Sequence, residues 1–456
     1  MKIYYAIVGG VVENKAPDRV GAWGPQTIPE LLKEKSLIDS EIRGVVSELI
    51  SEGYELELNG GHVFNNEREV FEKSRIIQES DAIIIYPVGP NSMVIRALLG
   101  FSKPTVVFIR SGERYYTFAE IFDSRVIRME TDHVMLPYPN DVFIIYDDLE
   151  ELKRALRGIY GAYKLRRAKI LYIGVPYGWQ GRFHEFRAFM RRIGSEIIFL
   201  DHDKAFEEAQ EYLESKEGRE EIMRYIDEIE RNASEIKMSK EGVELGIKQF
   251  IGLKYLAKKY GADVVTISGC MLYGASKWRA TPCLAFSLLD DHGLLGVCEG
   301  DLSNLVAKTL LRYVANKPAV FANPSIPNKG SEAVFAHCTA PTKLLGYGSR
   351  GFKYSLETHF ESDSPAAIKV FFEEGYKVTL LNLSFYLDKA LIVLGESAGF
   401  TNYPICRSQI KIRFRDTREI YGKARGFHWS YVYGDYTREL EYAMRILGIE
   451  YEVIRS

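Results

Sequence analysis

Short apolar runs alternate with amphipathic helical segments in the first part of the chain, and this alternation constrains the fold more than any other feature. Between the runs, Glu41–Glu52 and Glu67–Ser80 place apolar residues at helical spacing. Strands that alternate with helices are typical of a parallel, doubly wound sheet. We therefore predict an N-terminal α/β domain over residues 1–160. Its expected strands are Ile3–Val8, Tyr54–Leu58, Ala82–Val88, Thr105–Ile109 and Val142–Tyr146.

A second α/β domain is predicted over residues 161–332. It follows the basic helical segment Glu151–Arg167 and opens with an apolar run, residues 168–176, that ends in a Gly/Pro turn. The charged stretch from Lys204 to Tyr260 has helical periodicity, and its Glu and Lys runs are interpreted as solvated helix faces. The later strands are expected at Ser195–Leu200, Asp263–Ser268, Leu294–Val297 and Ala319–Phe321.

From Ala333 the pattern changes to apolar or alternating runs separated by turn residues, with little helix. This pattern favours an antiparallel, β-rich C-terminal domain over residues 333–456. The expected fold class is thus α/β, with two doubly wound parallel α/β domains followed by a β-rich domain. Expected elements are the strands Tyr376–Leu381, Ala390–Leu394 and Gln409–Phe414, the helix Thr437–Leu447 and the strand Tyr451–Ile454.

Composition excludes several classes of protein. A chain of 456 residues suggests two or three domains. The net charge of −3 gives no reason to expect a nucleic acid or an anionic membrane as partner. No run reaches the roughly 18 apolar residues of a membrane span. The 5 cysteines form no CxxC pair, which fits a reducing compartment. Because Met1-Lys2 leads straight into Ile3–Val8 without a signal-peptide pattern, we expect a cytoplasmic location.

Common cofactor motifs are missing from the sequence. The glycines after the first apolar run, in Val8-Gly9-Gly10-Val11-Val12, lack the GxGxxG spacing of a dinucleotide site. Neither a Walker A sequence nor a GxSxG elbow is present. We therefore expect no nucleotide cofactor.

Two carboxylates follow a predicted buried strand, in Val297-Cys298-Glu299-Gly300-Asp301. Such a strand delivers the acids to the carboxyl edge of the sheet, where α/β proteins bind ligands. Glu299 needs a partner, because an unpaired carboxylate is costly to bury. Asp301 has an alternative structural role, since it precedes the helical segment Leu302–Tyr313 and suits an N-cap.

Histidines supply the remaining candidate ligands. His337 follows the apolar run 333–336, and His428 precedes two aromatic residues, Trp429 and Tyr431. Carboxylates and neutral imidazoles together bind divalent ions such as Mn²⁺ or Co²⁺. We hypothesise one metal ion held by Glu299, His337 and His428, although each histidine taken alone would more often be a satisfied core residue.

Two further segments have competing interpretations. Residues 355–362 alternate, so that Glu357, His359 and Glu361 would share one face of a strand; this fits either a metal site or an exposed polar face. Asp290-Asp291-His292-Gly293 is interpreted as a turn before a strand.

Taken in order, several of these motifs carry a family resemblance. The order and spacing resemble the L-fucose/L-arabinose isomerase family, in its divergent fucose isomerase-like branch. The two preceding α/β regions agree with that family in class only. The motifs are Cys298-Glu299-Gly300-Asp301, Phe321-Ala322-Asn323-Pro324, His337-Cys338, residues 356–362 and Arg425-Gly426-Phe427-His428.

This resemblance implies a metal-dependent aldose–ketose isomerase that acts on an L-fucose- or L-arabinose-like sugar through an enediolate. The ion would be Mn²⁺, or another divalent cation such as Co²⁺ or Mg²⁺, bound by Glu299, His337 and His428. Glu299 or Asp301 would carry the proton, ideally with a pKa raised toward neutrality by partial burial.

Three residues, Asn323, His359 and Trp429, are expected to contact the substrate, each for a different reason. The resemblance places Asn323 on or near the position of a second family carboxylate, and an amide can bind metal or sugar but cannot shuttle protons. This departure keeps open an alternative, a metal- or sugar-binding homologue that has lost isomerase activity. His359 is a further candidate for binding the sugar. Trp429 would cover the apolar face of the sugar, unless it packs in the core with Tyr431 and Tyr433.

The family forms trimers or hexamers, so a homo-oligomer is expected besides the sugar substrate. Aromatic residues in Tyr115–Phe118 and Phe183–Phe186 would leave an apolar patch on a monomer, unless they are buried in the same chain. An open metal cleft also needs a cover against water, and no long Gly-rich lid loop is evident.

Overall fold

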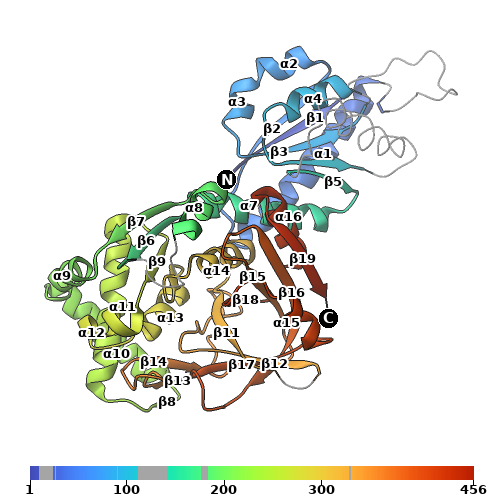
Figure 1. The fold of residues 1–456 in the computed structure, drawn as a ribbon. Helices are drawn as coiled ribbons and strands as arrows, with labels where there is room; N and C mark the ends of the chain where they lie inside the picture. The colour runs from blue at the N-terminus through green and yellow to red at the C-terminus, as the bar shows by residue number, and fades with distance from the viewer. Residues whose placement is uncertain are drawn as a thin grey trace. The chain divides into compact units, whose positions relative to one another are not determined.

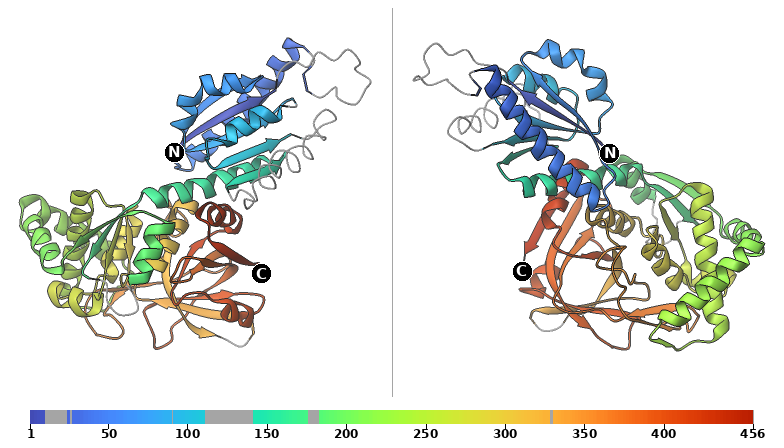
Figure 2. Two further views of the ribbon diagram at one scale, coloured as in Figure 1. Left: turned by 45° about the horizontal axis from the view of Figure 1, so that its top comes forward. Right: turned by 180° about the vertical axis from the view of Figure 1, so that it is seen from behind.

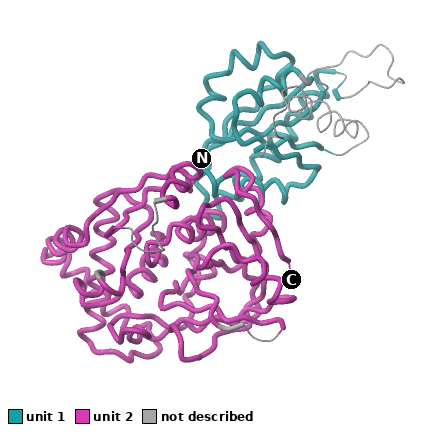
Figure 3. Tube along the Cα trace, in the orientation of Figure 1, with its two compact units in different colours: residues 1–163 teal, residues 164–456 magenta. Residues whose placement is uncertain are grey.

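The computed structural model describes residues 1–9, 24–25, 27–89, 91–110, 141–175, 183–327 and 330–455. The chain divides into two compact units, Met1–Tyr163 and Lys164–Ser456 (Figure 3). The predicted further division of the second unit at residue 332 stays a prediction. Mixed α/β structure with parallel sheets, followed by a β-rich region, confirms the coarse fold class.

Unit 1 is built on a 5-stranded parallel sheet with the order β2-β1-β3-β4-β5 (Figure 1). β3 and β4 are buried at every residue, which explains why their sequences are continuous apolar runs. The strands are β1 (Lys2–Val8), β2 (Glu57–Phe64), β3 (Ala82–Pro87), β4 (Thr105–Ile109) and β5 (Val142–Tyr146). The helices are α1 (Ile28–Ser51), α2 (Glu67–Glu72), α3 (Ser74–Gln78) and α4 (Ser92–Leu99).

Several element boundaries in unit 1 differ from the predicted ones, most clearly those of α1 and β2, and the predicted helical segment Glu67–Ser80 forms the two helices α2 and α3. α1 starts well before Glu41, because the Thr27 side chain accepts a hydrogen bond from Glu30 N at 3.3 Å and caps the helix. β2 begins at Glu57 instead of Tyr54, and it includes the polar run Asn59-Gly60-Gly61-His62. This strand lies at the edge of the sheet, where an apolar sequence is not required.

Unit 2 begins with a 4-stranded parallel sheet of order β10-β9-β6-β7. Its strands are β6 (Lys169–Ile173), β7 (Glu196–Leu200), β9 (Val264–Ile267) and β10 (Leu295–Val297). Helix α7 (Leu149–Arg167) leads into it. The following helices are α8 (Phe183–Arg192), α9 (His202–Leu213), α10 (Lys216–Asn232), α11 (Lys240–Tyr260), η3 (Cys270–Gly274), α12 (Ala275–Trp278), α13 (Cys283–Asp291) and α14 (Leu302–Ala315).

A barrel forms the β-rich part of unit 2 (Figure 2). The strand order is β15-β18-β11-β12-β17-β16-β19, and an additional β15–β16 pairing closes the barrel and leaves β19 outside it. Closure removes exposed sheet edges. The strands are β11 (Val320–Pro327), β12 (Glu332–His337), β15 (Lys377–Leu383), β16 (Lys389–Phe400), β17 (Ser408–Arg413), β18 (Trp429–Tyr433) and β19 (Glu450–Arg455). Helices α15 (Thr417–Lys423) and α16 (Thr437–Leu447) complete this part.

A small sheet beside the barrel overturns one prediction. It has the order β14-β13-β8, with β8 (Glu235–Ile236), β13 (Tyr354–Glu357) and β14 (Ala367–Val370). Because β13 ends at Glu357, the prediction that Glu357, His359 and Glu361 share one strand face is wrong. The chain turns there instead, as His359 N donates to Ser364 O at 2.7 Å.

A buried ion pair holds β10 in place. Lys308 Nζ lies 2.6 Å from Asp290 Oδ2, and both side chains are fully buried. The same ammonium donates to Gly296 O at 2.5 Å, while Gly296 N donates to Asp290 Oδ1 at 3.0 Å. Burial raises the pKa of Asp290 to about 7, although the Lys308 ammonium opposes this shift. Asp290 and Asp291 end α13, so the predicted turn starts only at His292.

Lys308→Met removes the cation and leaves Asp290 buried without it. We expect the free energy of unfolding to fall by about 3–5 kcal/mol at pH 8, the typical result of breaking a buried pair. The loss should be smaller at pH 5, because a carboxyl with a raised pKa is protonated there and needs no counter-ion. Urea unfolding at the two pH values measures both effects. The double variant Asp290→Asn, Lys308→Met should regain most of the loss; an equally unstable double variant would contradict the assignment.

Candidate active site

The carboxyl end of β10 carries a tight turn that presents Glu299. Glu299 and Gly300 both have left-handed backbone conformations, with φ of 65° and 68°, which is uncommon for a residue other than glycine. At Gly300 a Cβ atom would lie 2.3 Å from the Tyr172 hydroxyl, and that hydroxyl donates to Gly300 O at 3.1 Å. The turn thus depends on a glycine at 300 and on the tyrosine of β6.

Glu299 lies between the two predicted histidine ligands. Its Oε1 is 3.6 Å from His337 Nε2, and its Oε2 is 3.7 Å from His428 Nε2. His337 is the last residue of β12, and His428 immediately precedes β18. The structure therefore brings all three predicted metal ligands together, from the edge of the parallel sheet and from the barrel. The Glu299 side chain is 22% exposed, whereas that of His428 is 0% exposed.

The Phe321 ring fixes the two imidazoles. It is buried on β11, and its centroid lies 4.6 Å from the ring of His337 and 4.5 Å from the ring of His428. Packing of this kind restricts rotation of both imidazoles, which is what a preorganised ligand set needs.

Asp301 orients His428 and caps α14. Its Oδ1 accepts from Ser303 Oγ at 2.7 Å and from Asn304 N at 3.0 Å, which confirms the N-cap role. Its Oδ2 is 2.6 Å from His428 Nδ1. When Nδ1 carries the proton, it donates to Asp301, and the lone pair of Nε2 points toward Glu299. Many metal-binding histidines donate their other ring N–H to a carboxylate in this way. Because Asp301 is buried and both its oxygens have partners, it fits a positioning residue better than the predicted proton carrier.

Both carboxyl groups depart from the raised pKa that we expected for a proton carrier. Burial raises the pKa of Glu299, but the His337 and His428 imidazoles outweigh it and bring the value below the ordinary one. Burial also raises the pKa of Asp301, and its hydrogen bond and charge interaction with His428 reverse the shift. The expectation fails because neighbouring imidazoles favour the ionised carboxylate.

Asn323, a sequence-predicted substrate contact, lies on the strand next to that of His337. It lies on β11 opposite Ala336, the residue before His337. Its Oδ1 is buried and has no hydrogen-bond partner among the residues that the structure describes. A buried amide oxygen without a partner is costly, so a ligand or ion is a natural occupant beside it.

The other two predicted sugar contacts have less support. The buried His359 ring has Nδ1 3.2 Å from Ser362 Oγ and interacts with the Cys338 thiol, next to His337. The Trp429 ring is fully buried and packs edge-on against Phe335, with centroids 5.7 Å apart. The alternative of a core aromatic therefore fits Trp429, and its predicted contact with a sugar gains no support.

Sequence reasoning missed an exposed aromatic at the site. Phe427 is 53% exposed, and its ring centroid is 4.7 Å from that of His428. It is better placed than Trp429 to contact a bound molecule. The signal was its position directly before His428, but the sequence does not show which of the two aromatic residues that flank His428, Phe427 or Trp429, faces solvent.

The donor set suits a divalent cation. Ligands bound to one ion at about 2.0–2.2 Å lie roughly 3–4 Å apart when they subtend a right angle or more. The contacts of Glu299 with the two imidazoles fall in that range and are too long for hydrogen bonds. Within the described ranges, however, no three His, Cys, Asp or Glu side chains already converge on one point. Binding would therefore need side-chain adjustment.

No family model matches the sequence, and no curated protein shows significant similarity to it. Among the described helices, none combines the length and the apolar character required to cross a membrane.

Asp301→Asn keeps a capping side chain but removes the charge beside His428. We expect a loss of about 1.5–3 kcal/mol in the free energy of unfolding at pH 7, the usual value for a hydrogen bond to a charged group. Because its folded pKa is depressed, Asp301 stabilises the fold above the ordinary carboxyl pKa, and this contribution disappears as pH falls through the folded value. The difference from the parent should therefore shrink below pH 4 in urea titrations.

A double-variant cycle separates the imidazole contact from the cap. In a His428→Gln background, Asp301→Asn should cost clearly less than in the parent chain. An equal cost in both backgrounds would show that the cap alone accounts for the effect.

Proposed function

We propose that the chain is a metal-dependent aldose–ketose isomerase that acts on an L-fucose- or L-arabinose-like sugar. The observation that carries the proposal is the placement of Glu299 between His337 and His428, with Asp301 behind His428. The resemblance to the L-fucose/L-arabinose isomerase family supports it. The parallel α/β sheets agree with that family in class; a doubly wound arrangement of the two α/β parts belongs to the proposal.

Glu299, His337 and His428 would hold the ion, which would be Mn²⁺ or another divalent cation such as Co²⁺ or Mg²⁺, because carboxylate and imidazole donors together bind such ions. Once bound, such an ion supplies polarisation of the sugar carbonyl and stabilises developing negative charge. The protein contributes the orientation of the donors, through Phe321 against both rings and Asp301 on His428.

Glu299 is our candidate for the proton carrier. Its lowered pKa keeps it ionised at neutral pH, and part of its side chain is exposed. In the aldose-to-ketose direction it takes the C2 proton of the open-chain sugar. The C2–H electron pair forms the C1=C2 bond of an enediolate, while the C1=O π bond breaks and its electron pair moves to O1. The carboxyl then returns the proton to C1, while the O2 proton moves to O1 and C2=O forms. Asn323 and Phe427 would contact the sugar.

Asn323 also supports a second candidate, a metal- or sugar-binding protein without isomerase activity. Its amide replaces the second carboxylate expected from the family and cannot take up a proton. If Glu299 alone cannot complete the transfer, the chain binds the ligand and stops there. Asn323→Asp would then introduce proton exchange that the parent chain lacks.

Metal content tests the ligand assignment. Purified protein loaded with Mn²⁺ and desalted should retain about one ion per chain, because three good donors surround the site. Glu299→Ala and His428→Ala should each lose most of it, at least about tenfold in affinity. The matched control His184→Ala alters an exposed histidine of α8 and should keep the parent content. Parent-like metal content in both ligand variants would refute the site.

Deuterium exchange tests the chemistry. The Mn²⁺-loaded protein in D₂O should introduce deuterium at C1 or C2 of an accepted aldose or ketose. Glu299→Gln removes the base but not the bulk of the side chain, and should slow exchange by about 10²–10⁴-fold. Exchange at the parent rate would exclude Glu299 as the carrier. No exchange by the metal-bound parent with any sugar of an aldose panel would favour the binding protein.

A homo-oligomer, trimer or hexamer, also stays part of the proposal. Tyr115–Phe118 lies outside the described residues, and Phe186 packs against Tyr172 and Phe199 of its own chain at 5.8 and 5.7 Å. The aromatic residues therefore give a weaker reason for association than the sequence suggested, and the partly exposed Glu299 side chain, which a neighbouring subunit would shield from water, gives the stronger one. Light scattering at micromolar concentration should give a mass well above the 52.0 kDa of one chain. A monomeric mass would contradict it.

A further inference from the structure

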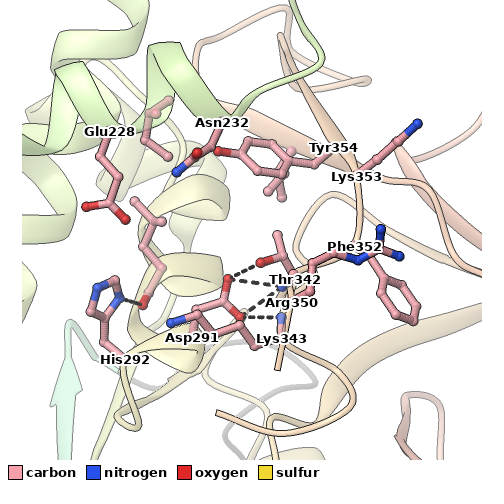
Figure 4. A pocket seen from close by; sticks show the side chains of 14 residues that line it. Glu228, Asn232, Asp291, His292, Thr342, Lys343, Arg350, Phe352, Lys353 and Tyr354 are labelled. Carbon is pink, nitrogen blue, oxygen red and sulfur yellow. Dashed lines mark hydrogen bonds between the residues drawn. The ribbon is translucent and has the colours of Figure 1, made fainter. Parts of the chain in front are cut away.

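A separate cavity lies at the opposite end of β10 from Glu299. Asp291 and His292, which precede β10, form one side of it (Figure 4). The cavity encloses about 310 Å³, which is at the lower end of the range for small-molecule sites. Helices α10 and α13, the segment 342–354 and β14 surround it.

Among the described residues, none forms a hydrogen bond with the Tyr354 hydroxyl in this cavity. Tyr354 is only 8% exposed and lines the cavity, yet its hydroxyl makes no hydrogen bond with any residue that the structure describes. Burial raises the pKa of Tyr354, and the charges of Asp291 and Glu228 raise it further. The hydroxyl oxygen is accessible from the cavity, so a bound molecule can supply the missing hydrogen bond. Its surroundings are electronegative, so a donor carrying positive charge is the partner that suits it.

Glu228 supplies a negative charge without a counter-ion. It is half-buried on α10, its carboxylate points into the cavity (Figure 4), and among the described residues it has no ion pair. The other carboxylate, Asp291, is already engaged: it accepts from Thr342 N at 2.9 Å, from Thr342 Oγ1 at 2.7 Å and from Lys343 N at 2.8 Å.

The cations around the cavity do not compensate Glu228. Arg350 pairs with Glu373 at 3.0 Å. The exposed Lys353 ammonium points away from the cavity in Figure 4. The Lys343 charge acts on Asp291, whose pKa it lowers against the larger effect of burial. A cation inside the cavity would therefore meet one uncompensated carboxylate.

We infer that this cavity binds a small organic ammonium ion. The carboxylate of Glu228 would pair with the ammonium group, and the Tyr354 oxygen would accept one of its N–H bonds. Ile229, Leu288 and Ile368 line the same cavity and would cover an aliphatic chain. An inorganic anion would face the Glu228 charge, and a neutral diol would leave that charge uncompensated. The inference is independent of the isomerase proposal, because none of these residues belongs to the Glu299 cluster.

Titration calorimetry with 1,4-diaminobutane tests it on the full-length protein. The diamine should bind saturably, and more tightly than 1,4-butanediol, which has the same length but no charge. Glu228→Gln should weaken binding by at least about tenfold, as expected for a hydrogen bond to a charged group. Tyr354→Phe, which keeps the ring, should weaken it several-fold. Glu230→Gln changes an exposed acid of the same helix and should bind like the parent.

Each contrary result overturns the inference. Absence of binding at millimolar diamine would do so, as would equal affinity for the diol or saturable binding of inorganic phosphate at this cavity. Equal losses in Glu228→Gln and Glu230→Gln would show a general charge effect instead of a site. Circular dichroism of each variant confirms that the fold is intact, and Tyr354→Phe provides an independent variant should Glu228→Gln unfold.

Discussion

The interaction of Lys308 with Asp290 and Gly296 is the constraint on which the functional part of unit 2 depends. β10 is short and lies at the edge of its sheet, so it pairs along one side only, with β9. The buried ion pair provides the missing support, because it contacts the backbone of Gly296 through both the carbonyl and the amide. Such a buried pair is tolerated because its charges are also satisfied by hydrogen bonds. The position of Glu299, two residues beyond the strand, follows from this anchoring.

Helix α14 carries the same constraint to the barrel. Its N-cap, Asp301, contacts His428, and in its first turn Asn304 accepts from Ser430 Oγ at 2.8 Å. Both contacts reach β18 or the residue before it. Lys308 lies further along the same helix, so one element fixes β10 on one side and the His428 imidazole on the other. The candidate site is therefore assembled by a helix that contributes no ligand of its own.

Secondary-structure elements could be predicted from the sequence where their burial produces a regular pattern of apolar residues. Thr105–Ile109 and Val142–Tyr146 are strands with the predicted bounds, since buried parallel strands are continuous apolar runs. β2 was misplaced because an edge strand can contain Asn59 and glycines. The alternation after β13 continued past the end of the strand, which is set by the hydrogen bonds of the turn around His359 and not by residue type.

The candidate site shows the same division. The proximity of Glu299, His337 and His428 could be predicted, because each lies beside an apolar run that ends at a sheet edge. The buried ring of Trp429 and the exposed ring of Phe427 could not, since alternation would place both on one strand face, and only the fold shows that β18 begins at Trp429 and leaves Phe427 outside the strand. The depressed pKa of Asp301 was also beyond reach, because it depends on His428, which only the tertiary fold brings near.

The contact between Tyr172 and Gly300 has an evolutionary consequence. The tyrosine hydroxyl occupies the space that a side chain at 300 would need and also binds the carbonyl of that residue. Positions 172 and 300 are therefore not free to vary one at a time. A descendant of this chain that acquires a side chain at 300 must first shorten residue 172, and it then loses the hydrogen bond that steadies the turn. Related sequences should therefore show substitutions at positions 172 and 300 that occur together, although the two positions are distant in sequence.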